Sequence, residues 1–386
     1  MYDFDRQTDR HGTASVQWDG IADRFGVPDL LPFTISDMDF ASPPEVLAAL
    51  RERVDHGVFG YTDWRLGEFR EAIRHWYASR YDAEVDPGTL VYAPSVLSQL
   101  SQLLRMWTEP GDGVVVHTPT YDGFRKAVTG LGRELRGVPL DDPAALEREL
   151  ARPDSRMLLL CSPHNPTGRV WTEEELTVFA GLAERYGAAV VSDEIHADLT
   201  TEGHRHVPWT RIAEPGRGRR WALITSGTKA FNFPALSGSY GMVGDPDERE
   251  AFIRRMETGE GLASPAVLSL TAHIAAYRRG AAWLDELRGY VAGTMDMVRE
   301  RLAEGLPEVD WTPPQAGYLA WIDLRPLGIE ESRLQEELVA VEKVAIMPGG
   351  VYGTPGFVRL NVGCPRSKAE RGVGALVRAA ARLRRG

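Results

Sequence analysis

The sequence predicts an α/β protein in which a mostly parallel sheet is accompanied by a smaller α+β part. The first observation is a series of short apolar runs that alternate with helical patterns, at GVVVHTP (113–119), RMLLLCSP (156–163), GAAVVSDE (187–194) and WALITSG (221–227). Strands that are separated by helices and apolar on both faces form parallel, doubly wound sheets. The second observation is a change of pattern beyond residue 285, which predicts the smaller part.

The helices between these strands carry recognisable ends. In WTEEELTVFAGLAERYG, Thr172 and Glu175 have the spacing of a capping box, and Gly187 is placed to end the helix. The segment SVLSQLSQLLRMWTEPGD has leucines at helical spacing, followed by Trp107, and stops at Pro110-Gly111. Both segments are therefore expected to be amphipathic helices that pack on the sheet.

After residue 285 the pattern predicts one long amphipathic helix and then three strands, at YLAWIDLRP (318–326), KVAIMPGG (343–350) and FVRLNVG (357–363). Residues 1–45 have few helix signals and are expected to pack with this part. We therefore expect a large domain over residues 46–285 and a small domain formed by residues 1–45 and 286–386.

Composition excludes several classes of function. A net charge of -11 argues against a surface for nucleic acid or anionic membrane, and no segment approaches the ~20 apolar residues of a membrane span. The first residues, MYDFDRQTDRHGT, lack a signal-peptide pattern, so we expect a cytoplasmic protein. Cys161 and Cys364 form no CxxC motif, and His204 and His206 are expected in a solvated loop, so no metal site is predicted.

Polar residues follow each predicted strand of the large sheet, at the edge where ligands bind in open α/β sheets. These residues are, in chain order, Tyr121, Asn165, Asp193, His196, Ser226, Thr228 and Lys229. Lysine is rare in this chain: it occurs only at positions 126, 229, 343 and 368 among 44 Lys and Arg residues. Unlike guanidinium, a desolvated amine can form a Schiff base. An amine, a carboxylate, an amide and hydroxyls together suit pyridoxal phosphate.

The motifs extend this interpretation to a family. The chain resembles fold-type-I pyridoxal-phosphate enzymes of the MalY/PatB type of cystathionine β-lyase over nearly its whole length. The resemblance implies an aminotransferase-like fold, with a three-layer α/β/α large domain and a smaller α+β domain. The matching segments are PFTISDMDFASPPEV, HGVFGYTDW, VYAPSVLSQL, LLCSPHNPTGRVW, SDEIHADL, TSGTKAFNFPAL, LTAHIAAY, YLAWIDLRPL, EKVAIMPG and FVRLNVGCPRS.

The resemblance also implies roles for individual residues. Lys229 would form the Schiff base and Asp193 would pair with the pyridinium nitrogen, while Asn165 and His196 would lie near the 3-oxygen. Tyr121 would stack on the ring, and Arg359 would bind the substrate carboxylate. The phosphate would be held by Ser95, Val96, Leu97, Ser226, Thr228 and, from the neighbouring subunit, Tyr61. The implied assembly is therefore a homodimer with a shared active site.

The expected reaction is α,β-elimination from L-cystathionine or another cysteine S-conjugate, with Lys229 as base and Tyr121 or Tyr61 as the acid for the leaving thiolate. Aminotransferases of this fold commonly have an arginine eight residues after the lysine, where this chain has Ser237. The lyases lack that arginine too, which favours a lyase. Two alternatives stay open: an aminotransferase acting on an amino acid, and a regulatory protein that binds a transcription activator.

Overall fold

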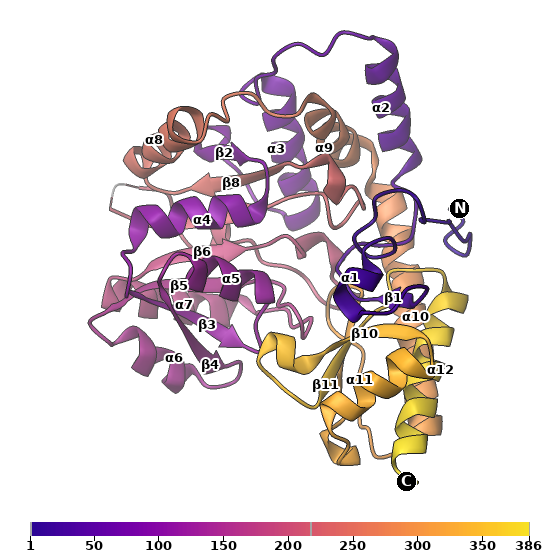
Figure 1. Cartoon of the computed structure of the whole chain (residues 1–386). Helices are drawn as coiled ribbons and strands as arrows, with labels where there is room; N and C mark the ends of the chain where they lie inside the picture. Colours follow the sequence, from indigo (N-terminus) through magenta and orange to yellow (C-terminus); the bar gives the residue numbers. More distant parts are fainter. Residues whose placement is uncertain (1, 217, 386) are drawn as a thin grey trace. The chain divides into compact units, whose positions relative to one another are not determined.

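A computed structural model describes residues 2–216 and 218–385 and divides the chain into two compact units (Figure 1). The large unit comprises Ser42–Asn165 and Arg169–Leu284. The small unit comprises Met1–Ala41, Pro166–Gly168 and Asp285–Gly386. Each unit has its own sheet.

The sheet of the large unit is mostly parallel, as predicted. Its strands, in spatial order, are β2 (Leu90–Ala93), β8 (Ser239–Val243), β7 (Trp221–Thr225), β6 (Ala189–Asp193), β5 (Ser155–Cys161), β3 (Gly113–Thr118) and β4 (Glu134–Pro139). Strand β8 runs antiparallel to both of its neighbours, whereas the pairings among β7, β6, β5, β3 and β4 are parallel. The four strands predicted from apolar runs are β3, β5, β6 and β7. They form the centre of the sheet.

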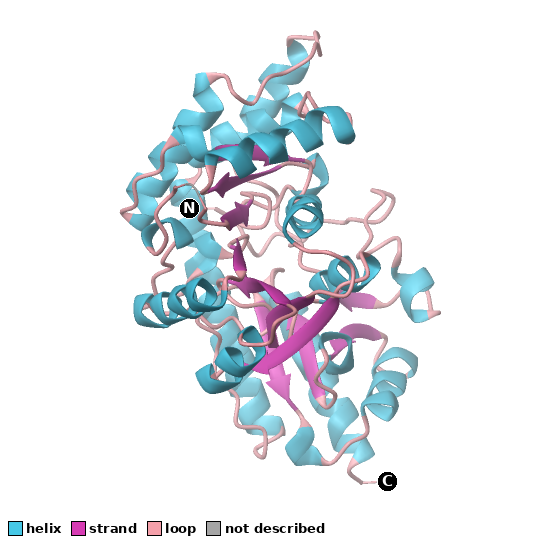
Figure 2. Cartoon of the chain, turned by 90° about the vertical axis from the view of Figure 1, so that its left-hand side faces the viewer, coloured by secondary structure: helices cyan, strands magenta, loops and turns pink. Residues whose placement is uncertain are grey.

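Helices flank these strands (Figure 2). The α-helices of the large unit are α2 (Pro44–Asp55), α3 (Gly67–Tyr81), α4 (Val96–Trp107), α5 (Asp122–Gly130), α6 (Pro143–Leu150), α7 (Glu173–Tyr186), α8 (Pro246–Arg254) and α9 (Val267–Arg279). Helix α10 (Ala281–Gly305) continues into the small unit.

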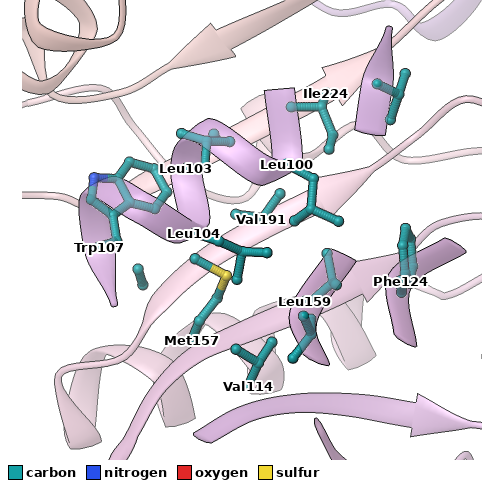
Figure 3. Close-up of a cluster of buried hydrophobic side chains, with 14 of the residues drawn as sticks. Leu100, Leu103, Leu104, Trp107, Val114, Phe124, Met157, Leu159, Val191 and Ile224 are labelled. Carbon is teal, nitrogen blue, oxygen red and sulfur yellow. The ribbon is translucent and has the colours of Figure 1, made fainter. Parts of the chain in front are cut away.

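Helix α4 covers part of the sheet with its apolar face. Figure 3 shows Leu100 and Leu104 of α4 in one buried cluster with strand residues that include Met157 and Val191. The sequence explains the helix, because leucines recur at helical spacing and Ser95 and Ser98 form a reciprocal capping box at its start. The predicted capping box of α7, with Thr172 as N-cap, is likewise present. The starts of both helices are thus fixed by local sequence.

The sheet of the small unit has the order β1 (Leu31–Phe33), β10 (Val344–Pro348), β11 (Phe357–Asn361) and β9 (Leu319–Asp323). The three predicted C-terminal strands are β9, β10 and β11, and β1 brings the N-terminal segment into the same sheet by pairing in parallel with β10. The remaining α-helices of the unit are α1 (Ile21–Phe25), α11 (Glu331–Ala340) and α12 (Arg366–Leu383).

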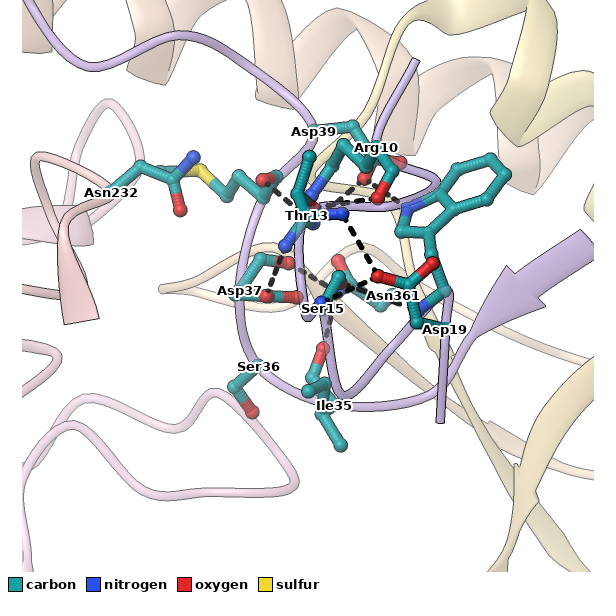
Figure 4. Close-up of polar contacts among 12 residues, drawn as sticks. Arg10, Thr13, Ser15, Asp19, Ile35, Ser36, Asp37, Asp39, Asn232 and Asn361 are labelled. Atoms are coloured by element: carbon teal, nitrogen blue, oxygen red, sulfur yellow. Dashed lines mark hydrogen bonds and ion pairs between the residues drawn. The ribbon is translucent and has the colours of Figure 1, made fainter. Parts of the chain in front are cut away.

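Ion pairs fix the N-terminal segment within the small unit (Figure 4). The guanidinium of Arg10 contacts Asp37 at 2.7 Å and Asp39 at 2.9 Å, and Asn361 of β11 donates hydrogen bonds to the carbonyls of Ile35 and Asp37. The buried ammonium of Lys368 donates a hydrogen bond to Asp39. These contacts tie residues 35–39 to the N-terminal segment, to β11 and to Lys368.

Candidate active site

One edge of the large sheet collects most of the predicted site residues. Strands β3, β5, β6 and β7 are parallel, so their carboxyl ends share this edge. Tyr121 follows β3, Asn165 follows β5, Asp193 ends β6, and the segment from Ser226 to Lys229 follows β7. The topology thus brings together side chains that are more than a hundred residues apart.

Asp193 is a buried carboxylate at the end of β6. Its side chain is 4% exposed, and its Oδ1 accepts a hydrogen bond of 3.0 Å from the N–H of Ile195. Burial raises the pKa of Asp193 to about 7, and the neighbouring charge of Glu194 adds to the rise. The Ile195 N–H and the positive charge of Lys229 act in the opposite direction. A cation near this carboxylate would therefore favour its ionised form.

Lys229 lies on a compact turn that follows β7. The N–H of Thr228 donates to Ser226 Oγ at 3.2 Å, and the N–H of Phe231 donates to the carbonyl of Gly227 at 3.0 Å. Position 227 has little room, because a Cβ there would lie 3.2 Å from the hydroxyl of Tyr277. The turn places Lys229 at the same edge as Asp193, and the positive charge of Lys229 acts to lower the pKa of that carboxyl.

Ser226 is directed toward the interior. Its hydroxyl is hydrogen-bonded to the carbonyl of Gly238 at 2.7 Å and to Nε2 of His273 at 3.1 Å, and the residue is 2% exposed. A hydroxyl has one proton, and the carbonyl of Gly238 and the ring of His273 already compete for it, so Ser226 has no proton left to donate to a ligand. Burial lowers the pKa of His273 to about 4, so the ring is neutral. Ser226 is therefore placed to fix the turn, and Thr228 is the other hydroxyl of this segment.

The start of α4 offers backbone donors at the end of β2. The N–H of Ser95 donates to Ser98 Oγ, and the N–H of Ser98 donates to Ser95 Oγ, each at 3.1 Å. Among the described residues no acceptor is recorded for the N–H groups of Val96 and Leu97. These two amides, with the helix dipole behind them, suit a phosphate. Ser98, which positions the cap, was not predicted as a site residue.

Tyr121, Asn165 and His196 complete the edge. Tyr121 is half-buried and packs edge-on against Phe124, with ring centroids 5.5 Å apart. The buried Asn165 donates its N–H to the sulfur of Cys161 at 3.4 Å, and Cys161 is the register partner of Asp193. His196 is also buried, three residues after the end of β6.

Two predicted residues differ from the others in their setting. The side chain of Tyr61 is fully exposed, in a loop between α2 and α3. Arg359 belongs to β11 of the small unit, where its Nη2 donates to the carbonyl of Thr34 at 2.8 Å and its guanidinium lies 4.6 Å from the Tyr352 ring centroid. It is 3% exposed, so its surroundings already orient the guanidinium.

The prediction of a solvated loop is wrong for His206. His206 is 2% exposed, and its Nε2 lies 2.9 Å from Oε2 of the equally buried Glu194. His204, two residues earlier, is exposed as expected. The apolar residues that follow His206, in HVPW, were the available sequence signal, because they indicate that the chain turns inward there.

The donor set at this edge fits pyridoxal phosphate. The buried carboxylate of Asp193 would gain a counter-ion from a pyridinium nitrogen, the amine of Lys229 would meet an aldehyde, and the free amides at the start of α4 would meet a phosphate. Among the described residues no group of three or more His, Cys, Asp or Glu side chains is arranged to hold a metal ion.

The fold and this edge define a class of enzyme, and comparison with known proteins identifies it. The chain belongs to the aminotransferase class I and II family, which it matches over residues 28–376.

Several individual proteins of known name are similar to this chain over nearly its whole length. The chain is 50% identical to protein MalY of Escherichia coli K12, across 98% of this chain and 99% of that protein. It is 36% identical to cystathionine beta-lyase PatB of Bacillus subtilis 168, across 96% and 97% respectively. The solved structure of the pyridoxal-phosphate-bound C-S lyase from Staphylococcus hominis matches with a TM-score of 0.91 at 26% identity, covering 98% of each chain. Among the described helices, none combines the length and apolarity needed to span a membrane.

Proposed function

We propose that this chain is a pyridoxal-phosphate-dependent carbon–sulfur β-lyase that converts L-cystathionine or another cysteine S-conjugate to a thiol, pyruvate and ammonia. The observation that supports this most strongly is that the buried carboxylate of Asp193 and the turn of Lys229 stand at the ends of two neighbouring parallel strands. The near-full-length similarity to MalY and to PatB supports the same reaction class.

Bound pyridoxal phosphate supplies an electron sink that makes the α-proton of an amino acid acidic and allows a β-substituent to leave. The chain supplies the groups around it. The amine of Lys229 anchors the cofactor and then moves the α-proton as general base. The carboxylate of Asp193 holds a negative charge beside the ring nitrogen. In this proposal Arg359 binds the substrate carboxylate through its planar fork of donors.

The remaining residues hold the cofactor in place. The N–H groups of Val96 and Leu97, with Ser95 and Thr228, bind the phosphate in this proposal, and the ring of Tyr121 stacks on the pyridine ring. Asn165 and His196 would lie near the 3-oxygen of the bound cofactor. The inward hydroxyl of Ser226 contributes by fixing the turn that carries Lys229.

Elimination is favoured over transamination by the residue eight positions after the lysine. Ser237 stands where aminotransferases commonly have a phosphate-binding arginine, and it is exposed with a φ of 45°. An aminotransferase acting on an amino acid remains the second candidate, because it uses the same lysine, aspartate and arginine.

We further propose a homodimer in which Tyr61 reaches the neighbouring subunit's site. Tyr61 stands in a loop whose apolar side chains face solvent: Val58 is 64% and Phe59 54% exposed. Exposed apolar residues gathered on one loop mark an interface. We propose a cytoplasmic location, which agrees with the two buried cysteines, Cys161 and Cys364, neither of which forms a disulfide.

The test is to incubate the purified protein with pyridoxal phosphate and a panel of cysteine thioethers, and to measure pyruvate and free thiol. We expect both products in equal amounts, and we expect Lys229→Ala to lose both the turnover and the visible absorbance of the bound cofactor. A Lys229→Ala variant with normal turnover would refute the assignment.

A further inference from the structure

A buried network of polar groups surrounds the residue next to Asp193. The carboxylate of Glu194 is 1% exposed, and both of its oxygens accept hydrogen bonds. Its Oε1 accepts from Ser192 Oγ at 2.9 Å and from the N–H of Trp209 at 2.8 Å, and its Oε2 lies 2.9 Å from Nε2 of His206. This carboxylate is therefore held from three separate points of the chain.

The backbone of Glu194 ties β6 to β7. Its N–H donates to the carbonyl of Ile224 at 2.9 Å, and its carbonyl accepts from Thr225 Oγ1 at 3.0 Å. Ile224 and Thr225 end β7, directly before the turn that carries Lys229. Glu194 thus links the strand end that carries Asp193 to the strand end that precedes Lys229.

His206 is well suited to be the partner of this buried charge. Its ring packs edge-on against Tyr81, with centroids 5.4 Å apart, and its Nδ1 is buried with no hydrogen-bond partner in the described part of the chain. The tautomer with the proton on Nε2 donates to Glu194 and leaves only a lone pair at Nδ1, so no N–H is left unsatisfied.

The charge of Glu194 also acts on its neighbour. A second negative charge beside Asp193 contributes to the raised pKa of that carboxyl. A hydrogen bond from His206 withdraws part of this charge, and hydrogen bonds to charged groups are stronger than neutral ones. An acid and a histidine buried here are costlier than an apolar pair of the same volume, so their use calls for a reason other than packing.

We propose that Glu194 and His206 form a positioning pair that aligns the carboxylate of Asp193 with the turn of Lys229 for cofactor binding. This inference rests on the proposed function, since it assumes that Asp193 and Lys229 hold pyridoxal phosphate. Glu194 and His206 act through Asp193 and the ends of β6 and β7, and they do not touch the cofactor themselves.

The test measures cofactor affinity by titrating the full-length protein, stripped of cofactor, with pyridoxal phosphate. Visible circular dichroism of the bound cofactor reports its orientation, and thermal melting reports folding. Glu194→Met removes both acceptor oxygens, and with them all three hydrogen bonds, at similar volume, whereas Glu194→Gln keeps an oxygen for Ser192 and Trp209. His206→Phe removes the donor, and His204→Phe is the matched control on the same segment.

We expect Glu194→Met and His206→Phe to weaken cofactor binding by about tenfold or more and to change the visible dichroism. Glu194→Gln should stay within about threefold of the parent, because it preserves two of the three hydrogen bonds. His204→Phe should match the parent. Parent-like affinity and dichroism in folded Glu194→Met and His206→Phe would overturn the proposal.

If those two variants fail to fold, Ser192→Ala decides, because it deletes one of the three hydrogen bonds that orient the carboxylate of Glu194. We expect a loss of about threefold in affinity with cooperative melting, and parent affinity in this variant would overturn the positioning role. Failure of the unaltered protein to bind pyridoxal phosphate would instead refute the proposed function, so the two failures are distinguishable.

Discussion

Asp193 shows how one residue's environment sets its chemistry. Burial raises the pKa of its carboxyl to about 7, and the charge of Lys229 only partly offsets this. A carboxyl whose pKa is higher in the folded than in the unfolded state stabilises the fold most at low pH, and this contribution is lost as the pH rises toward 7. A cationic ring nitrogen beside Asp193 would lower the pKa of this carboxyl again, because it favours the ionised form.

The cofactor-free protein should therefore respond to Asp193→Asn in a pH-dependent way. The quantity to compare is the melting temperature of the variant minus that of the parent. We expect this difference to be larger at pH 8 than at pH 5, by roughly 2 °C or more. The asparagine of the variant does not titrate, so the pH-dependent part of the melting difference reports the carboxyl of Asp193 together with its coupling to Glu194 and Lys229. A melting difference that does not change with pH would show that the buried carboxyl of Asp193 is not responsible.

Gly123 determines where the ring of Tyr121 lies. A Cβ at position 123 would lie 2.7 Å from Cζ of Tyr121, so the ring occupies space that only glycine leaves open. We expect Gly123→Ala to displace the ring, to lower cofactor affinity by about three- to tenfold and to leave the melting of the cofactor-free protein almost unchanged. The double variant Tyr121→Ala, Gly123→Ala should bind the cofactor as tightly as Tyr121→Ala alone, because the ring is then absent. If the losses in affinity of the two single changes add up in the double variant, position 123 does not act through the ring.

Sequence could place these residues at strand ends but could not orient all of them. Asp193 and Lys229 follow apolar runs, so their location was predictable from a local pattern. The inward turn of Ser226 depends on His273, which lies 47 residues later in the chain. The burial of His206 likewise depends on Glu194, a partner outside its own segment. Long-range partners of this kind have no local signature.

At the scale of elements, two helices begin in the same way but at different places. Ser95 caps α4 and Thr172 caps α7, each by a reciprocal capping box with the residue three positions later. Only the start of α4 has amides assigned to the phosphate in the proposed site. The two helices therefore allow the contribution of a cap to stability to be separated from its contribution to binding.

We expect Ser95→Ala and Thr172→Ala to destabilise the protein by a similar amount, about 1 kcal/mol each, because both remove an N-cap. Only Ser95→Ala should also weaken binding of pyridoxal phosphate, by several-fold. Chemical denaturation and cofactor titration measure the two effects. Equal cofactor affinity in both variants would show that the start of α4 does not bind the phosphate.

The burial pattern of each strand explains whether the sequence predicts it. Strands β3, β5, β6 and β7 are apolar on both faces, and this gives a continuous run that is easily recognised. Strand β4 lies at an edge and alternates exposed with buried residues in ELRGVP, so it gives no such run. Strand β2 has only four residues, and β8 has a glycine at its centre. Their pairing is decided by the sheet rather than by their own pattern.

At the scale of the whole molecule, the proposed homodimer would complete each site with a residue of the neighbouring subunit. Tyr61 is fully exposed in the single chain, and no local sequence pattern could reveal which surface covers it. If each site takes Lys229 from one subunit and Tyr61 from the other, two inactive variants can complement each other.

We expect Lys229→Ala and Tyr61→Ala to be inactive or strongly impaired alone. Mixed after unfolding and refolding together, they should recover up to about a quarter of the parent activity, since half of the dimers are mixed and each mixed dimer has one intact site. Sedimentation of the parent checks that it is a dimer. An equal mixture that recovers nothing, while still forming mixed dimers, would argue against a shared site.

The reaction proposed for this site is elimination of a β-thiolate and not exchange of an amino group. The most direct measurement is the yield of pyruvate and homocysteine from L-cystathionine, followed by NMR with and without an added 2-oxo acid. Elimination predicts one pyruvate for each homocysteine, with multiple turnovers and no dependence on the 2-oxo acid. Turnover that requires the 2-oxo acid, with formation of its amino acid and without free homocysteine, would contradict the account.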